Sequence, residues 1–309
     1  MEKLPVGDWA VRAAVCRLPK GLYSLPVTSG WWSMQLMPEL IDRQLEALET
    51  KPPQEARVLL HFGPHSHAVE KQKLQRALGL VEGLYVQTFS ETLSALSDDL
   101  GRIEALSVAG GLGKEGQKLF DLIRFPRVRS IAGHQDCYLS IEAARGLEEI
   151  SLVSSKNMAL PFLQEHQQLR RFGIVGSGAA RLLELGLPQT LEALALVRCR
   201  ALSDVSDISE MQKLLELEIE SCRQLTQVHS VGQCAALKYL MLHKLGPISD
   251  IAFVENLQNL EFISFMDVNV LDGRVERLRR LSRLKYAAFD NKRHYDARME
   301  NIAPGPFSV

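Results

Sequence analysis

The chain has 309 residues, of which 46% are hydrophobic, so it can bury the core of two ordinary domains or of one elongated repeat protein. Its 36 lysine and arginine residues nearly balance its 37 aspartate and glutamate residues. No excess charge therefore recruits nucleic acid or an anionic membrane surface, and a protein is the simpler partner to expect.

Targeting signals and cysteine spacing indicate the compartment. The N-terminal residues lack the uninterrupted apolar stretch of a signal peptide, and no apolar run approaches the roughly 20 residues that a membrane helix needs. We therefore expect a cytoplasmic protein. The cysteines are odd in number and lack C-x-x-C spacing, which argues against a disulfide framework and against a zinc site. They are Cys16, Cys137, Cys199, Cys222 and Cys234.

Residues 1–54 are predicted to form an N-terminal cap. Apolar residues alternate over 9–15, as in a half-buried strand, and turn-forming residues follow them. Leucines recur at helical spacing over 36–48, and Pro52 and Pro53 end the predicted helix. A hairpin and a helix of this kind would cover the apolar end of the first repeat.

From residue 55 the pattern changes to strands that are each followed by a helix. Short apolar runs alternate with segments that have helical periodicity and polar outer faces. The first units are therefore expected to carry full helices on their convex side. The predicted strands are 57–62, 84–86 and 103–108, and the predicted helices are 67–78, 90–100 and 114–125.

A second pattern begins near residue 147 and recurs every 22 to 24 residues. Its clearest copies lie in 191–222, where the phrase L-x-x-L-x-L-x-x-C occurs twice at an interval of 23 residues. This spacing is the signature of the leucine-rich repeat, in which a short strand begins each unit. The core positions of the seven copies are Leu147, Ile150 and Leu152; Leu169, Phe172 and Ile174; Leu191, Leu194 and Leu196; Leu214, Leu217 and Ile219; Leu237, Leu240 and Leu242; Leu260, Ile263 and Phe265; Leu284, Ala287 and Phe289.

The segments that return from one strand to the next are short in these later units. They predict extended or 3-10 convex sides in place of full helices. The fold class is therefore α/β, a leucine-rich-repeat solenoid over residues 55–290 with a curved parallel sheet on its concave face. Cys199 and Cys222 occupy the inward ninth position and are expected to be buried free thiols. Residues 291–309 are a charged segment followed by a tail that we expect to be disordered.

With these repeats, the chain resembles bacterial cytoplasmic leucine-rich-repeat proteins of irregular 22- to 24-residue period. That group includes internalin-like binders and immunity proteins that neutralise toxins from neighbouring cells. The run FDNKRHYD, residues 289–296, is similar to the closing segment of some members. The resemblance implies a protein that binds another protein.

The residues between the core positions of each strand point to the concave face, because strand side chains alternate. Three carboxylates on one strand are followed by aromatic residues, methionines and a histidine on the next three, and such a patch is typical of a protein interface. The alternatives are that the C-terminal segment covers the patch, that the register is shifted by one residue, or that the acidic strand is merely solvated. The candidate partner-binding residues are Glu216, Glu218, Glu220, Tyr239, Met241, His243, Phe262, Met266 and Tyr286.

Other motifs have simpler explanations. The basic run 274–285 also contains Leu278 and Leu281, which favours the solvated face of an amphipathic convex helix over a nucleic-acid site. The glycines of 111–116 and 172–180 imitate a dinucleotide fingerprint, but both lie in repeat strands and turns. Three histidines within 61–67 could bind a metal, although a loop tip explains them as well.

The function that we expect is binding of one protein partner by the concave C-terminal half. The most specific form of this hypothesis is a monomeric bacterial immunity protein that neutralises a toxin with a basic and apolar surface. The alternatives are a general cytoplasmic adaptor or scaffold and, least favoured, a nucleotide-binding enzyme. No catalytic, cofactor-binding or metal-binding residue is assigned, and no nucleic-acid or membrane partner is expected.

Overall fold

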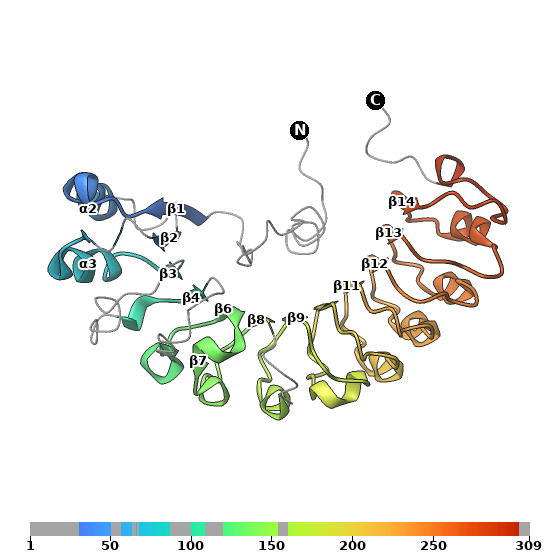
Figure 1. Ribbon diagram of the computed structural model, residues 1–309, viewed down its shortest axis with the longest axis horizontal. Helices are drawn as coiled ribbons and strands as arrows, with labels where there is room; N and C mark the ends of the chain where they lie inside the picture. Colours follow the sequence, from blue (N-terminus) through green and yellow to red (C-terminus); the bar gives the residue numbers. More distant parts are fainter. Residues whose placement is uncertain are drawn as a thin grey trace. The chain divides into compact units, whose positions relative to one another are not determined.

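The computed structural model describes residues 31–50, 57–63, 66, 68–86, 100–108, 120–153 and 160–302. Within them the chain forms two compact units, one that ends at Leu152 and one that begins at Val153. Parallel strands and short helical segments alternate in both units, and each unit is described by itself (Figure 1).

The N-terminal unit is built on parallel strands in which each pairs with the next. Its sheet strands are β1 (Trp31–Gln35), β2 (Arg57–Phe62), β3 (Gly83–Val86), β4 (Ala105–Val108), β6 (Ser130–His134) and β8 (Glu149–Val153). A second, two-stranded sheet consists of β5 (Phe120–Asp121) and β7 (Tyr138–Leu139). The helical segments are η1 (Pro38–Leu40), α2 (Ile41–Thr50), α3 (Lys71–Leu78), η3 (Leu100–Arg102), η4 (Leu122–Arg124), η5 (Gln135–Cys137) and η6 (Ile141–Ala143).

The predicted helix of the cap is present as α2, which buries Ile41, Leu45 and Leu48 on one side at helical spacing. The strand before it, β1, pairs in parallel with β2, so residues 31–50 already have the strand-then-helix order of the units that follow. The predicted strand at 9–15 lies outside the described residues. The boundary of the cap at residue 54 therefore stays a prediction.

The first helix of the repeats is confirmed as α3, and the helix expected over 90–100 falls almost entirely outside the described residues. The prediction of a helix over 114–125 is wrong for its described part, which forms β5 and the 3-10 helix η4. Pro126 follows Phe125 and disfavours the α conformation there. In addition, the Asp121 side chain accepts a hydrogen bond from the Ile123 N–H, which starts a tight 3-10 turn.

The C-terminal unit repeats one arrangement six times, a parallel strand on the inner side and a 3-10 helix on the outer side, as Figure 1 shows. The predicted short convex sides are thus confirmed. The strands are β9 (Arg171–Val175), β10 (Ala193–Val197), β11 (Glu216–Glu220), β12 (Tyr239–His243), β13 (Phe262–Phe265) and β14 (Tyr286–Phe289). The 3-10 helices are η7 (Pro161–Glu165), η8 (Leu182–Leu185), η9 (Ser206–Glu210), η10 (His229–Gln233), η11 (Ala252–Asn256) and η12 (Val275–Arg280), with η13 (Met299–Asn301) at the end.

The core of this unit is a ladder in which equivalent residues of successive repeats meet. Leu194 lies opposite Leu217, which lies opposite Leu240, and all three are 0% exposed. Each rung covers the apolar side of the previous one, so the hydrophobic stabilisation grows with every repeat. Cys199, Cys222 and Cys234 of this unit are buried free thiols, as predicted for the first two.

Five of these six strands, β9 to β13, are followed by a residue of left-handed conformation. Gly176 is followed at repeat spacing by Arg198, Ser221, Lys244 and Asp267, and all five have positive φ. The left-handed residue turns its N–H toward the next repeat. The N–H groups of Gly176, Arg198 and Ser221 donate to the carbonyl at the end of the following strand at 2.8, 2.8 and 2.9 Å. The turn therefore locks the register of adjacent repeats.

The charged segment after β14 closes the end of the core. Tyr295 packs edge-on against Phe289, with 6.0 Å between ring centroids, and its hydroxyl accepts a hydrogen bond from the Val270 N–H at 3.1 Å. Asp296 accepts a hydrogen bond from the Glu276 N–H at 2.8 Å. Residues 291–302 thus cover the last repeat, and the tail predicted to be disordered lies beyond the described residues.

We predict that Ser221→Gly stabilises the protein by about 0.5–1 kcal/mol. An L-residue in the left-handed conformation costs roughly 1–2 kcal/mol, which the substitution removes. Glycine makes the unfolded chain more flexible, and this lowers the stability by roughly 0.5–1 kcal/mol and offsets part of the gain. The free energy of unfolding in urea measures the change. Ser203→Gly, at an exposed serine outside the left-handed region, is the matched control and should destabilise. A loss of stability in Ser221→Gly would contradict the proposed role of the turn.

Candidate functional site

The concave face, defined here as the side of β9–β14 opposite the leucine core, carries three columns of side chains. On β11 the core residues Leu217 and Ile219 alternate with Glu216, Glu218 and Glu220, so the predicted orientation of the three carboxylates is confirmed. Glu216 lies opposite Tyr239 of β12, Glu218 opposite Met241, and Glu220 opposite His243. The same register continues to Phe262 of β13 and Tyr286 of β14.

The candidate residues differ in exposure, and four of them are buried although they lie on the concave face. Glu216, Glu218, Tyr239 and Met241 are buried, with Glu218 and Met241 each 1% exposed. Glu220, His243, Phe262 and Tyr286 are half-buried, and Met266 is exposed at 37%.

The physical reason for this burial is crowding. A residue of the middle column has neighbours along its own strand and on both adjacent strands, which lie about 4.8 Å away. Side chains on the inner side of a curved sheet also converge. The middle column is accordingly buried throughout: Gly173, Ala195, Glu218, Met241, Ser264 and Ala288.

Three aromatic rings form a continuous stack in the first column. The Tyr239 and Phe262 rings lie 4.2 Å apart at 8°, and the Phe262 and Tyr286 rings lie 4.6 Å apart at 14°. Parallel strands in register hold equivalent side chains at nearly this spacing, so the sheet itself builds the stack. We call these three residues the aromatic ladder. Its buried end is Tyr239 and its half-exposed end is Tyr286.

Two of the three carboxylates on β11 have basic partners. The Arg171 guanidinium crosses the small Ala193 and donates to Glu216 at 2.9 Å. Lys244, the left-handed residue after β12, donates to Glu220 at 3.2 Å. These contacts neutralise the outer columns, and the sequence prediction missed them because it treated the carboxylates as one acidic group. The signal was present: Arg171 stands in the same column as Glu216, and only an alanine separates them.

Glu218, between these two, is different. Its Oε2 atom is buried and has no hydrogen-bond partner among the described residues. Burial, with a smaller effect from the charge of Glu220, raises the pKa of Glu218 to about 8. The side chain is therefore largely protonated at neutral pH. Burial and the nearby carboxyl groups of Glu218 and Glu216 also raise the pKa of Tyr239.

His243 forms the other polar contact of this face. Its Nε2 atom lies 2.6 Å from the Ser264 hydroxyl, and burial lowers the pKa of His243. The imidazole is thus neutral at physiological pH, and it anchors a buried serine on the neighbouring strand. Ser264 is a further residue of the face that the sequence prediction passed over.

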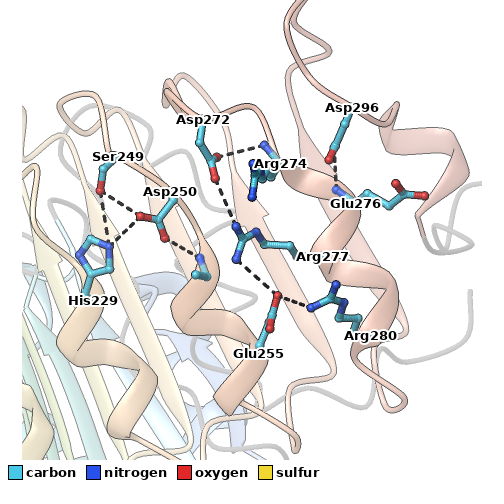
Figure 2. A network of polar contacts seen from close by, with 11 residues as sticks. His229, Ser249, Asp250, Glu255, Asp272, Arg274, Glu276, Arg277, Arg280 and Asp296 are labelled. Atoms are coloured by element: carbon cyan, nitrogen blue, oxygen red, sulfur yellow. Dashed lines mark hydrogen bonds and ion pairs between the residues drawn. The ribbon is translucent and has the colours of Figure 1, made fainter.

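The outer side of the last repeats carries a network of polar contacts, shown in Figure 2. Glu255 accepts from Arg280 at 2.9 Å and from Arg277 at 3.5 Å, and Arg277 also reaches Asp272 at 3.5 Å. A cavity of about 330 Å³ lies among these residues. It is lined by Glu255, Arg274, Glu276, Arg277, Arg280 and Asp296, and their charges balance.

The basic run 274–285 forms much of this network. Arg279 pairs with Glu276 at 2.6 Å, and Lys285 pairs with Glu261. The segment is the 3-10 helix η12 in place of the amphipathic α-helix that the spacing of its leucines predicts. Because carboxylates of the same and the preceding repeat surround these side chains, the run is a poor site for nucleic-acid phosphates.

One cluster in the same network has the composition of a catalytic triad. His229 Nε2 lies 3.2 Å from Asp250 and 3.5 Å from the Ser249 hydroxyl. In a triad the aspartate and the serine contact opposite ring nitrogens, so that one orients the ring and the other gives up its proton. Here both contacts share one nitrogen, and the cluster does not activate Ser249.

The glycine-rich runs and the histidine run predicted no site of their own, and the structure describes only 172–180 in full. The glycine-rich run 172–180 consists of β9 and a turn, and the next helical segment is the four-residue η8, so no long helix presents its N-terminus to a pyrophosphate. The run 111–116 and the histidine side chains of 61–67 lie outside the described residues. In the part of the chain that is described, no group of three or more potential ligand side chains is arranged to hold a metal ion.

No protein-family model matches the chain, and no curated protein matches it. Solved structures do. An internalin from Listeria monocytogenes is 14% identical, with 77% of this chain and 68% of that chain covered at a TM-score of 0.50. Internalin C2 from the same species is 16% identical, covering 64% of this chain and 78% of that one at a TM-score of 0.43. A leucine-rich-repeat protein from Leptospira interrogans is 13% identical, with 84% of this chain and 82% of that chain covered at a TM-score of 0.36.

The likeness to the first internalin concerns the fold alone, and it agrees with the parallel strands and 3-10 segments described above. The predicted leucine-rich-repeat solenoid is therefore confirmed. Separately, none of the helices in the described ranges has both the length and the apolar character needed to cross a bilayer.

We predict that Glu218 makes the stability of the protein fall as pH rises. Its pKa is about 8 in the folded protein against an ordinary value of 4.5, so the folded state holds a proton that the unfolded chain lacks between these limits. The stabilisation that comes from this bound proton is fully present below about pH 4.5. It is lost as the pH rises from there to about 8, and the free energy of unfolding falls by up to about 1.4 kcal/mol per pH unit.

Unfolding in urea at several pH values tests this prediction. Glu218→Gln, which keeps the shape and has no proton to lose, should show a smaller loss of stability between about pH 5 and pH 8 than the wild type. The matched control is Glu261→Gln, at a partly exposed carboxylate that pairs with Lys285 away from Glu218, and it should follow the wild-type profile. Parallel pH profiles for the wild type and Glu218→Gln would show that Glu218 is not held protonated.

Proposed function

We propose that this chain is a protein-binding leucine-rich-repeat protein that binds one protein partner with the concave face of its C-terminal unit. The observation that carries the proposal is the aromatic ladder, whose half-exposed end, Phe262 and Tyr286, lies on the same face as the exposed Met266. Aromatic and methionine side chains on a rigid sheet are typical anchors of protein interfaces, since they bury large areas at low entropic cost.

The surroundings of the ladder support a protein partner over a nucleic acid. Three carboxylates lie on β11, and Asp290 follows β14 in the third column of the face. The basic side chains Arg171 and Lys244 are already paired with Glu216 and Glu220 and offer little attraction to phosphates, whereas an apolar protein surface with basic residues near Asp290 would be complementary. The arginines of η12 are paired with carboxylates on the outer side and offer no compensating attraction.

The most specific form of the proposal is a cytoplasmic, monomeric immunity protein that occludes a bacterial toxin. One continuous recognition face in the C-terminal unit favours a single stoichiometric partner, in contrast to a general adaptor that engages several. Purification of the tagged chain from its source organism separates these possibilities. One partner at equimolar ratio supports the immunity function, and a set of substoichiometric partners supports the adaptor.

We predict that Phe262→Ala combined with Tyr286→Ala weakens binding of the purified partner by about 30-fold or more, the effect of removing interface anchors worth about 2 kcal/mol. Isothermal titration calorimetry measures the loss. Leu183→Ala combined with Leu271→Ala removes apolar side chains that are 56% and 58% exposed outside the concave face, and it should leave the affinity unchanged. Equal losses in the two double variants would place the interface elsewhere.

A further inference from the structure

The outer side of the C-terminal unit has a groove between the 3-10 helices η8 and η9. Its volume is about 600 Å³, within the usual range for ligand sites. η8 ends at Leu185, Gly186 follows in the left-handed conformation, and the lining continues through Leu187 and Pro188. Because Leu183 of the lining is 56% exposed, the groove is open to solvent.

Two leucines of this groove depart from the pattern of the next repeat. Counted back from the core leucine of each repeat, Leu183 takes the position of Ser206, and Leu187 takes the position of Glu210. Burial in the core does not explain Leu183, because the adjacent Leu182, 1% exposed, already supplies the buried side chain. Apolar side chains at outward positions of this kind are typical of an interaction surface.

The η9 side of the groove is acidic. Asp207 is half-buried there, and its Oδ2 atom has no hydrogen-bond partner among the described residues. Glu210 also lines the groove, but it accepts a hydrogen bond from Gln189 at 3.1 Å. Lys213, the basic residue of the lining, is exposed and pairs with neither acid in the part of the chain that the structure describes. The lining thus has one more acid than base, and a carboxylate oxygen without a donor favours a cation.

Two glutamines of the lining suit a peptide backbone. The side-chain N–H groups of Gln167 and Gln212 donate to nearby backbone carbonyls, that of Gln167 to Gln164 at 2.7 Å and that of Gln212 to Ser209. Their amide oxygens accept no hydrogen bond from the described residues, so they are acceptors for the N–H groups of an extended chain.

We propose that this groove binds an extended segment of another protein in which an apolar residue and a lysine or arginine lie two positions apart. Residues i and i+2 of an extended chain point to the same side. The apolar side chain then packs on Leu183 and Leu187, and the cation pairs with Asp207. Complementarity of charge and polarity selects this ligand, since the apolar patch lies in the same groove as an acid that lacks a donor. The groove is outside the concave face, so the inference goes beyond the proposed function and does not depend on it.

The test titrates the full chain, labelled with ¹³C at its leucine methyl groups, with acetyl-Leu-Ala-Lys-amide and with acetyl-Lys-Ala-Leu-amide. We expect at least one of the two peptides to shift the Leu183 and Leu187 methyl signals with a Kd on the order of 1 mM. Acetylation of the lysine side chain removes the charge, and it should weaken binding at least about fivefold. Serine in place of leucine removes the apolar anchor and should weaken binding about tenfold.

Variants of the chain locate the contacts. Asp207→Asn should weaken the lysine peptide at least about fivefold and leave the acetyl-lysine peptide unchanged, because only the charged pair is lost. Leu183→Ala should weaken both peptides. The matched controls are Glu261→Gln and Leu271→Ala, an acid that pairs with Lys285 and a leucine that is 58% exposed, and neither should change the affinity.

Three results would overturn the inference: equal binding of the lysine and acetyl-lysine peptides, wild-type affinity in Asp207→Asn, or no shift of the Leu183 and Leu187 signals at about 20 mM peptide. A dimer in analytical ultracentrifugation that Leu183→Ala dissociates would also overturn it, since the occupant would then be a second copy of this chain. The effect of Phe262→Ala with Tyr286→Ala on the concave-face partner is measured separately, so the proposed function stands or fails on its own.

Discussion

The structure depends on the requirement that every core leucine meet its counterpart on the next strand. A single strand with its 3-10 return cannot bury its own apolar side, so each repeat is stable only against its neighbours. The left-handed residues after β9, β10 and β11 enforce the match, since their N–H groups donate to the end of the following strand. Leu194, Leu217 and Leu240 are fully buried because this register is kept without a slip.

The same register decides the concave face. Strand side chains alternate, so alignment of the leucines also aligns the residues between them, and equal positions stack on one another. This is why Tyr239, Phe262 and Tyr286 form one ladder of rings, and why Arg171 can reach Glu216 across a single small residue. The 22- to 24-residue spacing of the core leucines therefore also determines which side chains meet on the concave face.

Much of this follows from the sequence, because a period of 22 to 24 residues fixes which residues lie on the core side and which on the concave side. Exposure does not follow from it. Glu218 and Met241 are enclosed by neighbours on adjacent strands, and this crowding depends on the size of side chains one and two repeats away. The helix expected over 114–125 fails for a local reason, since Pro126 and the Asp121 side chain favour a 3-10 turn over an α-helix.

The distribution of ion pairs indicates why recognition belongs on the concave face. On the outer side, Arg280 meets Glu255 and Lys285 meets Glu261, about one repeat earlier, so charges of opposite sign cancel between neighbouring units. Exposed pairs of this kind add little stability each, but they remove the field that would attract a charged partner. On the concave face, Arg171 and Lys244 likewise pair with Glu216 and Glu220, while the half-exposed rings of Phe262 and Tyr286 stay uncovered among the described residues. Apolar contact is therefore what this face offers to a partner.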